Sequence, residues 1–380
     1  MPRGVLICGA VIIAVVLAPG LPPVRTVVIT AALVPEMIGI APAVSSMTAR
    51  PTRESTTYGA PRDEMHVYLP AGARPDMALP AVVLALGVHP QPIDHPDIAG
   101  LAEAIARVGV VVGVPDSTAL RNLQVTPAEP GHLADAVLAL AARPEVDASR
   151  VGLAGFSAGA SICLVAATDP RLAGRLAWVS AFGGYADARR LLVDVATRTT
   201  TGESGEPVDW QPDPGIRRDV LELTLNALDD AAQRVVLREL LGPIVDAETR
   251  PSTPPVPERM TGDGVALYRL FTATERSSGE AAVASLGPEL LAHLDGISPT
   301  PVADMVSVPV FLLHGRPDTA IPVVHAPLLR AAIGHEVGRM TIFGRFGHGQ
   351  PGSAGLGLDD AGDIIELSLF LRDIVAAATE

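Results

Sequence analysis

The pentapeptide Gly-Phe-Ser-Ala-Gly at residues 155–159 is the first part of the chain whose residue types could do chemistry. An apolar run at 151–154 precedes it and small residues at 158–161 follow it, which is typical of a strand that turns into a helix. In a G-x-S-x-G turn the glycines relieve crowding, so the serine hydroxyl projects clear of the sheet. The pattern predicts that Ser157 is a nucleophile.

A serine hydroxyl is a weak nucleophile at neutral pH, so it needs a histidine base and a carboxylate that orients the base. Both occur downstream, each in a loop after an apolar run typical of a buried strand. Asp318 follows the run 308–313, and His348 follows the run 339–343. We therefore predict a triad in which His348 is the base and Asp318 is the acid.

Other histidines and acids near these loops have simpler interpretations. His314 ends an apolar strand, where we expect a local hydrogen bond rather than the role of base. His325 and His335 fall on or beside a predicted helix, and we expect them at the surface. The acids that do not directly follow a core strand are also expected at the surface; they are Asp304, Asp359 and Asp360.

Metal and redox chemistry have little support in the sequence. His89 and His95 lie near two acids, but prolines at 90, 92 and 96 make this a stiff loop without helical ligand spacing. Cys8 and Cys163 can form neither a disulfide framework nor a CxxC metal site. We therefore expect no metal and no organic cofactor.

Strands and helices alternate on both sides of Ser157. Strand, helix and strand in succession imply parallel pairing, so the pattern predicts a doubly wound, mostly parallel sheet of the α/β class. The expected strands are 81–86, 110–114, 151–156, 176–182, 308–313 and 339–343. The expected helices between and after them are 98–108, 132–142, 158–168, 323–333 and 360–378.

The alternation stops between residues 185 and 306, where amphipathic stretches at 219–241, 264–271 and 281–294 are separated by proline-rich breaks. We predict that 185–306 is a helical insertion that caps the sheet. The two parts of the sheet domain are then 55–184 and 307–380.

Residues 1–48 form a hydrophobic leader. An apolar run at 5–18 follows Arg3, a proline-rich breaker follows, and a second run at 27–47 contains an A-x-A pattern at 41–43. A signal peptide, a membrane hairpin and a buried helix pair all stay open, and we expect membrane association through residues 5–47 or export, with a cytoplasmic protein as the alternative. Residues 45–65, rich in Ser, Thr, Arg and Pro, are interpreted as a linker, followed by a short strand at 65–70.

The chain is acidic, with 42 Asp and Glu against 28 basic residues, and the net charge of −14 would repel a polyanion. No basic stripe with interleaved aromatic residues offsets this charge, so we exclude nucleic acid as a partner. Oligomeric state is left open.

The chain resembles the α/β-hydrolase superfamily, near its dienelactone-hydrolase-like and prolyl-oligopeptidase-like branches. Segments 144–159, 314–318 and 347–349 carry the resemblance, which covers about 60–184 and 306–378. It implies an oxyanion hole made by the backbone N–H groups of Ala158 and Val88. Leu86 departs from the family pattern, because a histidine stands at its place there.

Together these features predict a serine hydrolase that cleaves carboxylic esters through an acyl-enzyme on Ser157, with a small ester-like substrate. A peptidase or an acyltransferase with the same triad stays open. A non-catalytic, membrane-tethered binding module is the alternative of another class.

Overall fold

The computed structural model describes residues 48–59, 63–88, 91–202, 204–248, 255–258, 260–344, 347–348 and 361–379. The predicted leader lies outside the described residues, apart from Thr48. Within the described ranges, no helix is both long and apolar enough to cross a membrane.

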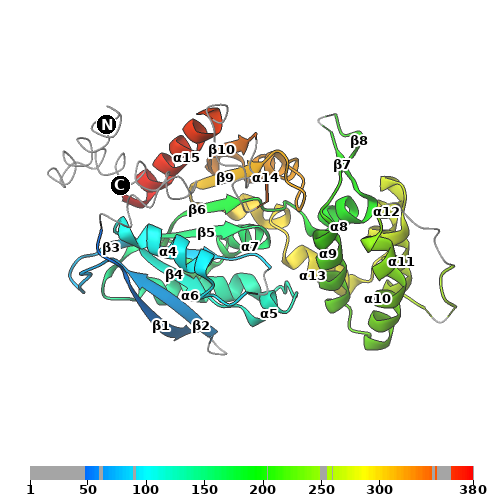
Figure 1. Ribbon diagram of the computed structural model, residues 1–380, viewed down its shortest axis with the longest axis horizontal. Coiled ribbons are helices and arrows are strands. Elements are labelled where there is room, and N and C mark those ends of the chain that lie inside the picture. The colour runs from blue at the N-terminus through cyan, green and yellow to red at the C-terminus, as the bar shows by residue number, and fades with distance from the viewer. Residues whose placement is uncertain are drawn as a thin grey trace, which may run out of the picture.

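A central sheet of eight strands organises the described chain, in the order β1-β2-β4-β3-β5-β6-β9-β10 (Figure 1). β1 and β2 pair antiparallel, β2 pairs antiparallel with β4, and the remaining neighbours are parallel. The predicted mostly parallel α/β sheet is confirmed. The bounds are β1 Thr52–Tyr58, β2 Asp63–Leu69, β3 Leu79–Ala85, β4 Val111–Pro115, β5 Val146–Phe156, β6 Leu176–Phe182, β9 Val310–Gly315 and β10 Val337–Phe343.

Helices cover both faces of the sheet, as a parallel sheet requires. The apolar residues of α4 and α15 pack on one face together with Trp178 and Phe311. Those of α6, α7 and α14 pack on the other, in the larger core cluster. The bounds are α4 Pro96–Arg107, α6 Glu129–Ala141, α7 Ala158–Ala166, α14 His325–Ile333 and α15 Ala361–Thr379, with a short helix α5 at Thr118–Arg121.

The linker expected at 45–65 is wrong at residues 52–58 and 63–65, which lie in strands. Residues 52–58 form β1, which pairs with β2 from Thr52 opposite Leu69 to Tyr58 opposite Asp63. This strand is polar because it is the edge of the sheet, and its first four residues are exposed. Threonine and serine suit an exposed strand, and edge strands tolerate polar side chains on both faces.

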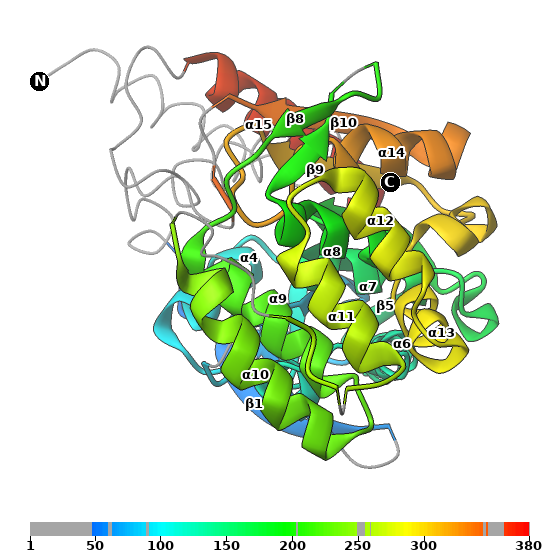
Figure 2. The same ribbon diagram turned by 90° about the vertical axis from the view of Figure 1, so that its right-hand side faces the viewer.

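Between β6 and β9 the chain forms a separate helical layer, called the cap from here on, at one end of the molecule (Figures 1 and 2). Two of the three predicted amphipathic stretches are each divided into two helices. Asp230 caps a new helix by accepting from the N–H groups of Ala232 and Gln233, and Pro288 begins another. The cap elements are α8 Ala188–Thr197, β7 Thr199–Thr201, β8 Pro207–Asp209, α9 Pro214–Asn226, α10 Ala231–Asp246, α11 Asp263–Thr272, α12 Arg276–Ala284 and α13 Pro288–Gly296.

The two ends of the cap are joined to each other, in a contact called the stem. The backbone N–H and the hydroxyl of Thr300 both donate to the carbonyl of Ala186, at 3.0 and 2.8 Å. The hydroxyl of Ser298 accepts from the N–H of Ala188 at 2.9 Å. The chain therefore leaves the sheet domain and returns to it through neighbouring segments.

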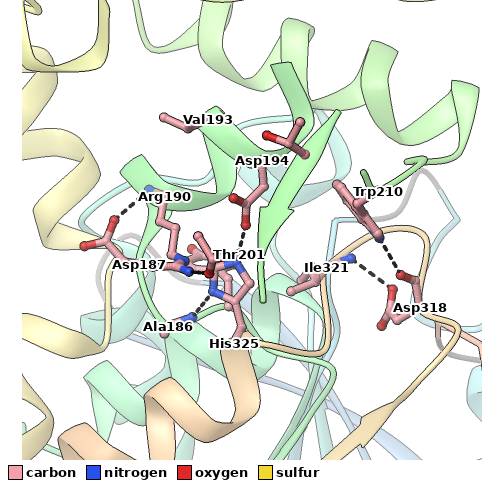
Figure 3. A network of polar contacts seen from close by, with 12 residues as sticks. Ala186, Asp187, Arg190, Val193, Asp194, Thr201, Trp210, Asp318, Ile321 and His325 are labelled. Atoms are coloured by element: carbon pink, nitrogen blue, oxygen red, sulfur yellow. Dashed lines mark hydrogen bonds and ion pairs between the residues drawn. The ribbon is translucent and has the colours of Figure 1, made fainter. Parts of the chain in front are cut away.

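A buried ionic cluster connects the cap to the sheet domain (Figure 3). Asp194 of α8 contacts Arg276 of α12 through Oδ1, at 2.5 Å, and His325 of α14 through Oδ2, at 3.1 Å. Nδ1 of His325 accepts from the N–H of Ala186 at 3.0 Å, so Nε2 carries the proton that faces Asp194.

The surface position expected for His325 is wrong, because its side chain is completely buried in this cluster. Its partner Asp194 is 131 residues away in the chain, so no local pattern reveals the contact. Both Asp194 and Arg276 are also buried. Each is stabilised by the other, since an isolated buried charge is strongly unfavourable.

Replacing Asp194 with alanine should lower the free energy of unfolding by about 3–5 kcal/mol, because the buried Arg276 then keeps only the exposed Glu280 as a counter-ion and His325 loses its buried partner. Urea denaturation measures this change. The control is Asp295→Ala, which removes the partly exposed pair of Arg189 and Asp295 in the same cap and should cost no more than about 1 kcal/mol. Equal losses in the two variants would contradict a special role for the buried cluster.

Candidate active site

Ser157 lies at the turn from β5 to α7 in a backbone conformation that side chains rarely adopt, with φ 55° and ψ −130°. The glycines on either side are needed because the chain passes close to itself. A Cβ on Gly155 would lie 2.5 Å from the carbonyl oxygen of Gly159, and one on Gly159 would lie 2.3 Å from that of Leu86. The turn is held by the N–H of Ser157, which donates to the Phe182 carbonyl at 2.8 Å.

His348, which follows β10, contacts both of its predicted partners. Its Nε2 lies 2.8 Å from Oγ of Ser157, and its Nδ1 lies 2.9 Å from Oδ2 of Asp318. The three residues come from the carboxyl ends of β5, β9 and β10, which meet at one edge of a parallel sheet. The structure therefore places Ser157, His348 and Asp318 in one hydrogen-bonded line.

Asp318 is buried and held by its own loop (Figure 3). Its Oδ1 accepts from the N–H groups of Ala320 and Ile321 at 2.8 and 2.9 Å, which leaves Oδ2 for His348. Burial alone would raise the pKa of Asp318, but the hydrogen bond and charge of His348, with a smaller contribution from His314, lower it below its ordinary value. Asp318 is therefore an anion at neutral pH.

A contact from the cap to the acid loop could not be read from the sequence. The indole N–H of Trp210, just after β8, donates to the backbone carbonyl of Asp318 at 3.1 Å (Figure 3). The cap therefore touches the loop that carries the acid.

His314 makes the local hydrogen bond expected of it. Its Nε2 lies 2.9 Å from the carbonyl oxygen of Ile321, so this nitrogen carries the proton, and it also lies 3.4 Å from Oδ2 of Asp318. Burial lowers the pKa of His314, which keeps the ring neutral. No hydrogen bond joins His314 to Ser157 among the described residues.

The remaining sequence candidates lie away from this line. His335 and Asp304 are exposed, as expected. His95 caps α4, where its Nδ1 faces the N–H of Asp97 at 3.4 Å. The other positions named in the sequence analysis lie outside the described residues; they are His89, Asp359 and Asp360.

Val88 and Ala158 line the same cavity as Ser157. Ala158 is the first residue of α7, so its N–H has no acceptor within the helix. The loop after β3 comes very close to the serine, because a Cβ on Gly87 would lie 2.8 Å from Cβ of Ser157. Two backbone segments are therefore within reach of a group bound at Oγ.

The cavity above Ser157 has a volume of about 290 Å³ and is closed mainly by the cap. Its walls are mostly aliphatic. On the cap side they come from one face of α9, from α8 and from α13, with Leu191, Leu192, Ile216, Val220, Leu223, Leu290 and Leu294. Such a lining suits an apolar ligand group, because concave apolar pockets bind small molecules by burying their surface.

No protein-family model and no curated protein matches the chain. Similar solved structures include an acylaminoacyl peptidase of Pyrococcus horikoshii, with a TM-score of 0.51 and 11% sequence identity over 87% of this chain and 42% of that one. Puromycin hydrolase is similar with a TM-score of 0.50 and 17% identity, over 86% of this chain and 39% of that one. The chain thus spans less than half the length of these proteins.

These similarities, at low identity, bear on the fold alone. The chain has the α/β-hydrolase fold.

Proposed function

We propose that the protein is a serine hydrolase that cleaves carboxylic esters through an acyl-enzyme on Ser157. One observation carries the proposal, namely the continuous line from Oγ of Ser157 through both ring nitrogens of His348 to the buried carboxylate of Asp318. A carboxylate at Nδ1 holds the proton there, so the lone pair of Nε2 faces the serine hydroxyl.

In this mechanism Nε2 of His348 takes the hydroxyl proton as Oγ of Ser157 attacks the ester carbonyl carbon. The carbonyl π bond breaks, and the resulting oxyanion accepts hydrogen bonds from the N–H groups of Val88 and Ala158. As the carbon–oxygen bond to the alcohol breaks, the imidazolium gives its proton to the leaving alkoxide. Water, deprotonated by the same nitrogen, then attacks the acyl carbon. The bond from this carbon to Oγ of Ser157 breaks, His348 returns the proton to Oγ, and the carboxylic acid leaves.

The lining of the cap favours a substrate with an apolar acyl or alcohol portion, because aliphatic side chains close the cavity above Ser157. Cleavage of an amide bond is the second candidate, and the name of the similar acylaminoacyl peptidase favours it. Parallel assays with p-nitrophenyl esters and the corresponding p-nitroanilides separate the two, since they differ only in the bond that is cleaved.

A fluorophosphonate probe should label the protein, and Ser157→Ala should abolish labelling and ester hydrolysis together, because no other group would then accept the phosphonyl or acyl group. Mass spectrometry of the labelled peptide checks the site. Labelling or hydrolysis that persists in Ser157→Ala would remove Ser157 from the mechanism, and a protein inert to both probe and esters would point to a binding module.

Replacing Asp318 with asparagine should lower kcat by about 10³–10⁴, because the amide group can donate to Nδ1 and so favours the wrong tautomer of His348. Steady-state kinetics with a p-nitrophenyl ester measures the loss. Asp304→Asn is the control, since Asp304 is exposed and should leave kcat unchanged. A loss of less than tenfold in Asp318→Asn would argue for another acid.

Gly159→Ala should lower kcat/KM by about 100-fold if it displaces the reacting groups by about 1 Å. The added Cβ would meet the backbone oxygens of Leu86 and Ala85 at 2.3 and 2.7 Å, and backbone cannot move as easily as a side chain. Gly131→Ala, in α6, is the matched control because nothing lies within 4 Å of its added Cβ. Equal activity in the two variants would mean that the turn tolerates the extra atom.

A further inference from the structure

Asp219 of α9 is the one carboxylate among the described residues that line the mostly apolar cavity. It lies on the same helical face as Ile216, Val220 and Leu223, which also line the cavity. Among the described residues that line the cavity there is no arginine, and the chain contains no lysine. Asp219 therefore gives the cap side of the cavity its negative charge.

The other polar side chains of the cap wall already have partners. The hydroxyl of Tyr185 donates to the carbonyl of Ile297 at 3.0 Å, and that of Thr224 donates to the carbonyl of Val220 at 2.7 Å. Asp219, by contrast, makes no hydrogen bond or ion pair with any residue that the structure describes.

His293, also in the wall, has its Nε2 at 2.8 Å from the Val125 carbonyl oxygen. Since a carbonyl oxygen only accepts, Nε2 must carry a proton. Nδ1 of the neutral ring then acts only as an acceptor, so it cannot donate a hydrogen bond to Asp219.

The arginines next to Asp219 are engaged elsewhere. Arg218 makes two contacts with Oδ1 of Asp246, at 2.8 and 3.1 Å, and Arg217 donates to the carbonyl of Ala247 at 2.9 Å. Both arginines therefore face the end of α10 rather than the cavity. The carboxylate of Asp219 is left to whatever occupies the cavity.

Such a carboxylate is unfavourable in an empty cavity and favourable beside a cation. Burial raises the pKa of Asp219 by more than the charge of Arg218 lowers it, so the surroundings disfavour the ionised carboxylate. A bound cation would offset this penalty. The net charge of −14 acts in the same direction, because it raises the local concentration of cations near the protein.

We propose that Asp219 selects substrates that carry a positively charged group, such as an ammonium, on the portion held by the cap. This inference rests on the proposed function, because it names the substrate class of the same site. Apolar side chains would hold the carbon chain between the scissile carbonyl and the cation, while Asp219 would bind its far end. A neutral ester of the same shape would leave the carboxylate unpaired.

The test uses pairs of p-nitrophenyl esters that differ only in charge. One member of each pair is an ω-(trimethylammonio)alkanoate and the other is the tert-butyl compound of the same shape, with spacers of increasing length. The readout is the ratio of kcat/KM for the charged ester to that for the neutral ester. For the best spacer we expect a ratio above one that falls about tenfold in Asp219→Asn.

Asp229→Asn is the matched control, because Asp229 is exposed and outside the cavity wall but carries the same charge in the same cap. Its ratio should stay at the wild-type value. Equal falls in both variants would show that the net charge alone attracts the cation, and a ratio below one for every spacer would show that the cavity selects neutral esters. Either result overturns the proposal.

A second readout does not require turnover. Alkyltrimethylammonium ions should protect Ser157 from a fluorophosphonate better than neutral alkanes of the same shape, and Asp219→Asn should remove the difference. Equal protection by the two compounds in the wild type would contradict the role of Asp219. Failure of the proposed function looks different, since it would appear as absent labelling or as hydrolysis that survives in Ser157→Ala.

Discussion

The close approach of three backbone segments at Ser157 is the constraint on which the site depends. The turn has a positive φ at a residue with a side chain, and that conformation costs free energy that the surrounding packing must offset. Gly155 leaves room for the carbonyl of Gly159, and Gly159 leaves room for the end of β3. The same contacts that hold the strained serine therefore set the distance between the serine and the loop that contains Val88.

The carboxyl ends of the sheet strands position Ser157, Asp318 and His348, while the cap supplies much of the cavity wall. Two of the contacts between these parts differ greatly in burial. The pair of Asp194 and His325 is fully buried beneath the cap, whereas Trp210 reaches the acid loop from the hairpin end. The backbone carbonyl of Asp318 accepts a hydrogen bond from Trp210, and its side chain accepts one from His348. The loop that contains Asp318 therefore links the position of the cap to the orientation of the His348 ring.

Residues that carry a local signal could be predicted from the sequence. Glycines around Ser157, apolar runs before Asp318 and His348, and the chain order of the three were enough to place them at one edge of a parallel sheet. β6 was predicted with its observed bounds, Leu176–Phe182, because a continuous apolar run defines a buried strand. Buried residues with distant partners could not be predicted, and His325 is the clearest case, since its helix carries no sign of Asp194.

Polar and short elements were also missed, for a different reason. β1 has the composition of a linker because most of its side chains face water, and only its pairing with β2 makes it a strand. The break between α9 and α10 depends on Asp230, whose capping role is evident only once a helix follows it. Asp219 carries no signal in the sequence, because its importance comes from the apolar residues that the fold places around it.

The stem has a consequence for how proteins of this architecture can diverge. Hydrogen bonds from Thr300 to Ala186 and from Ala188 to Ser298 hold the first and last residues of the cap together. An insertion whose ends are already joined can change in length or sequence at little entropic cost to the domain that bears it. Natural variation could therefore exchange the cap, and with it the walls of the cavity, while Ser157, His348 and Asp318 stay where they are.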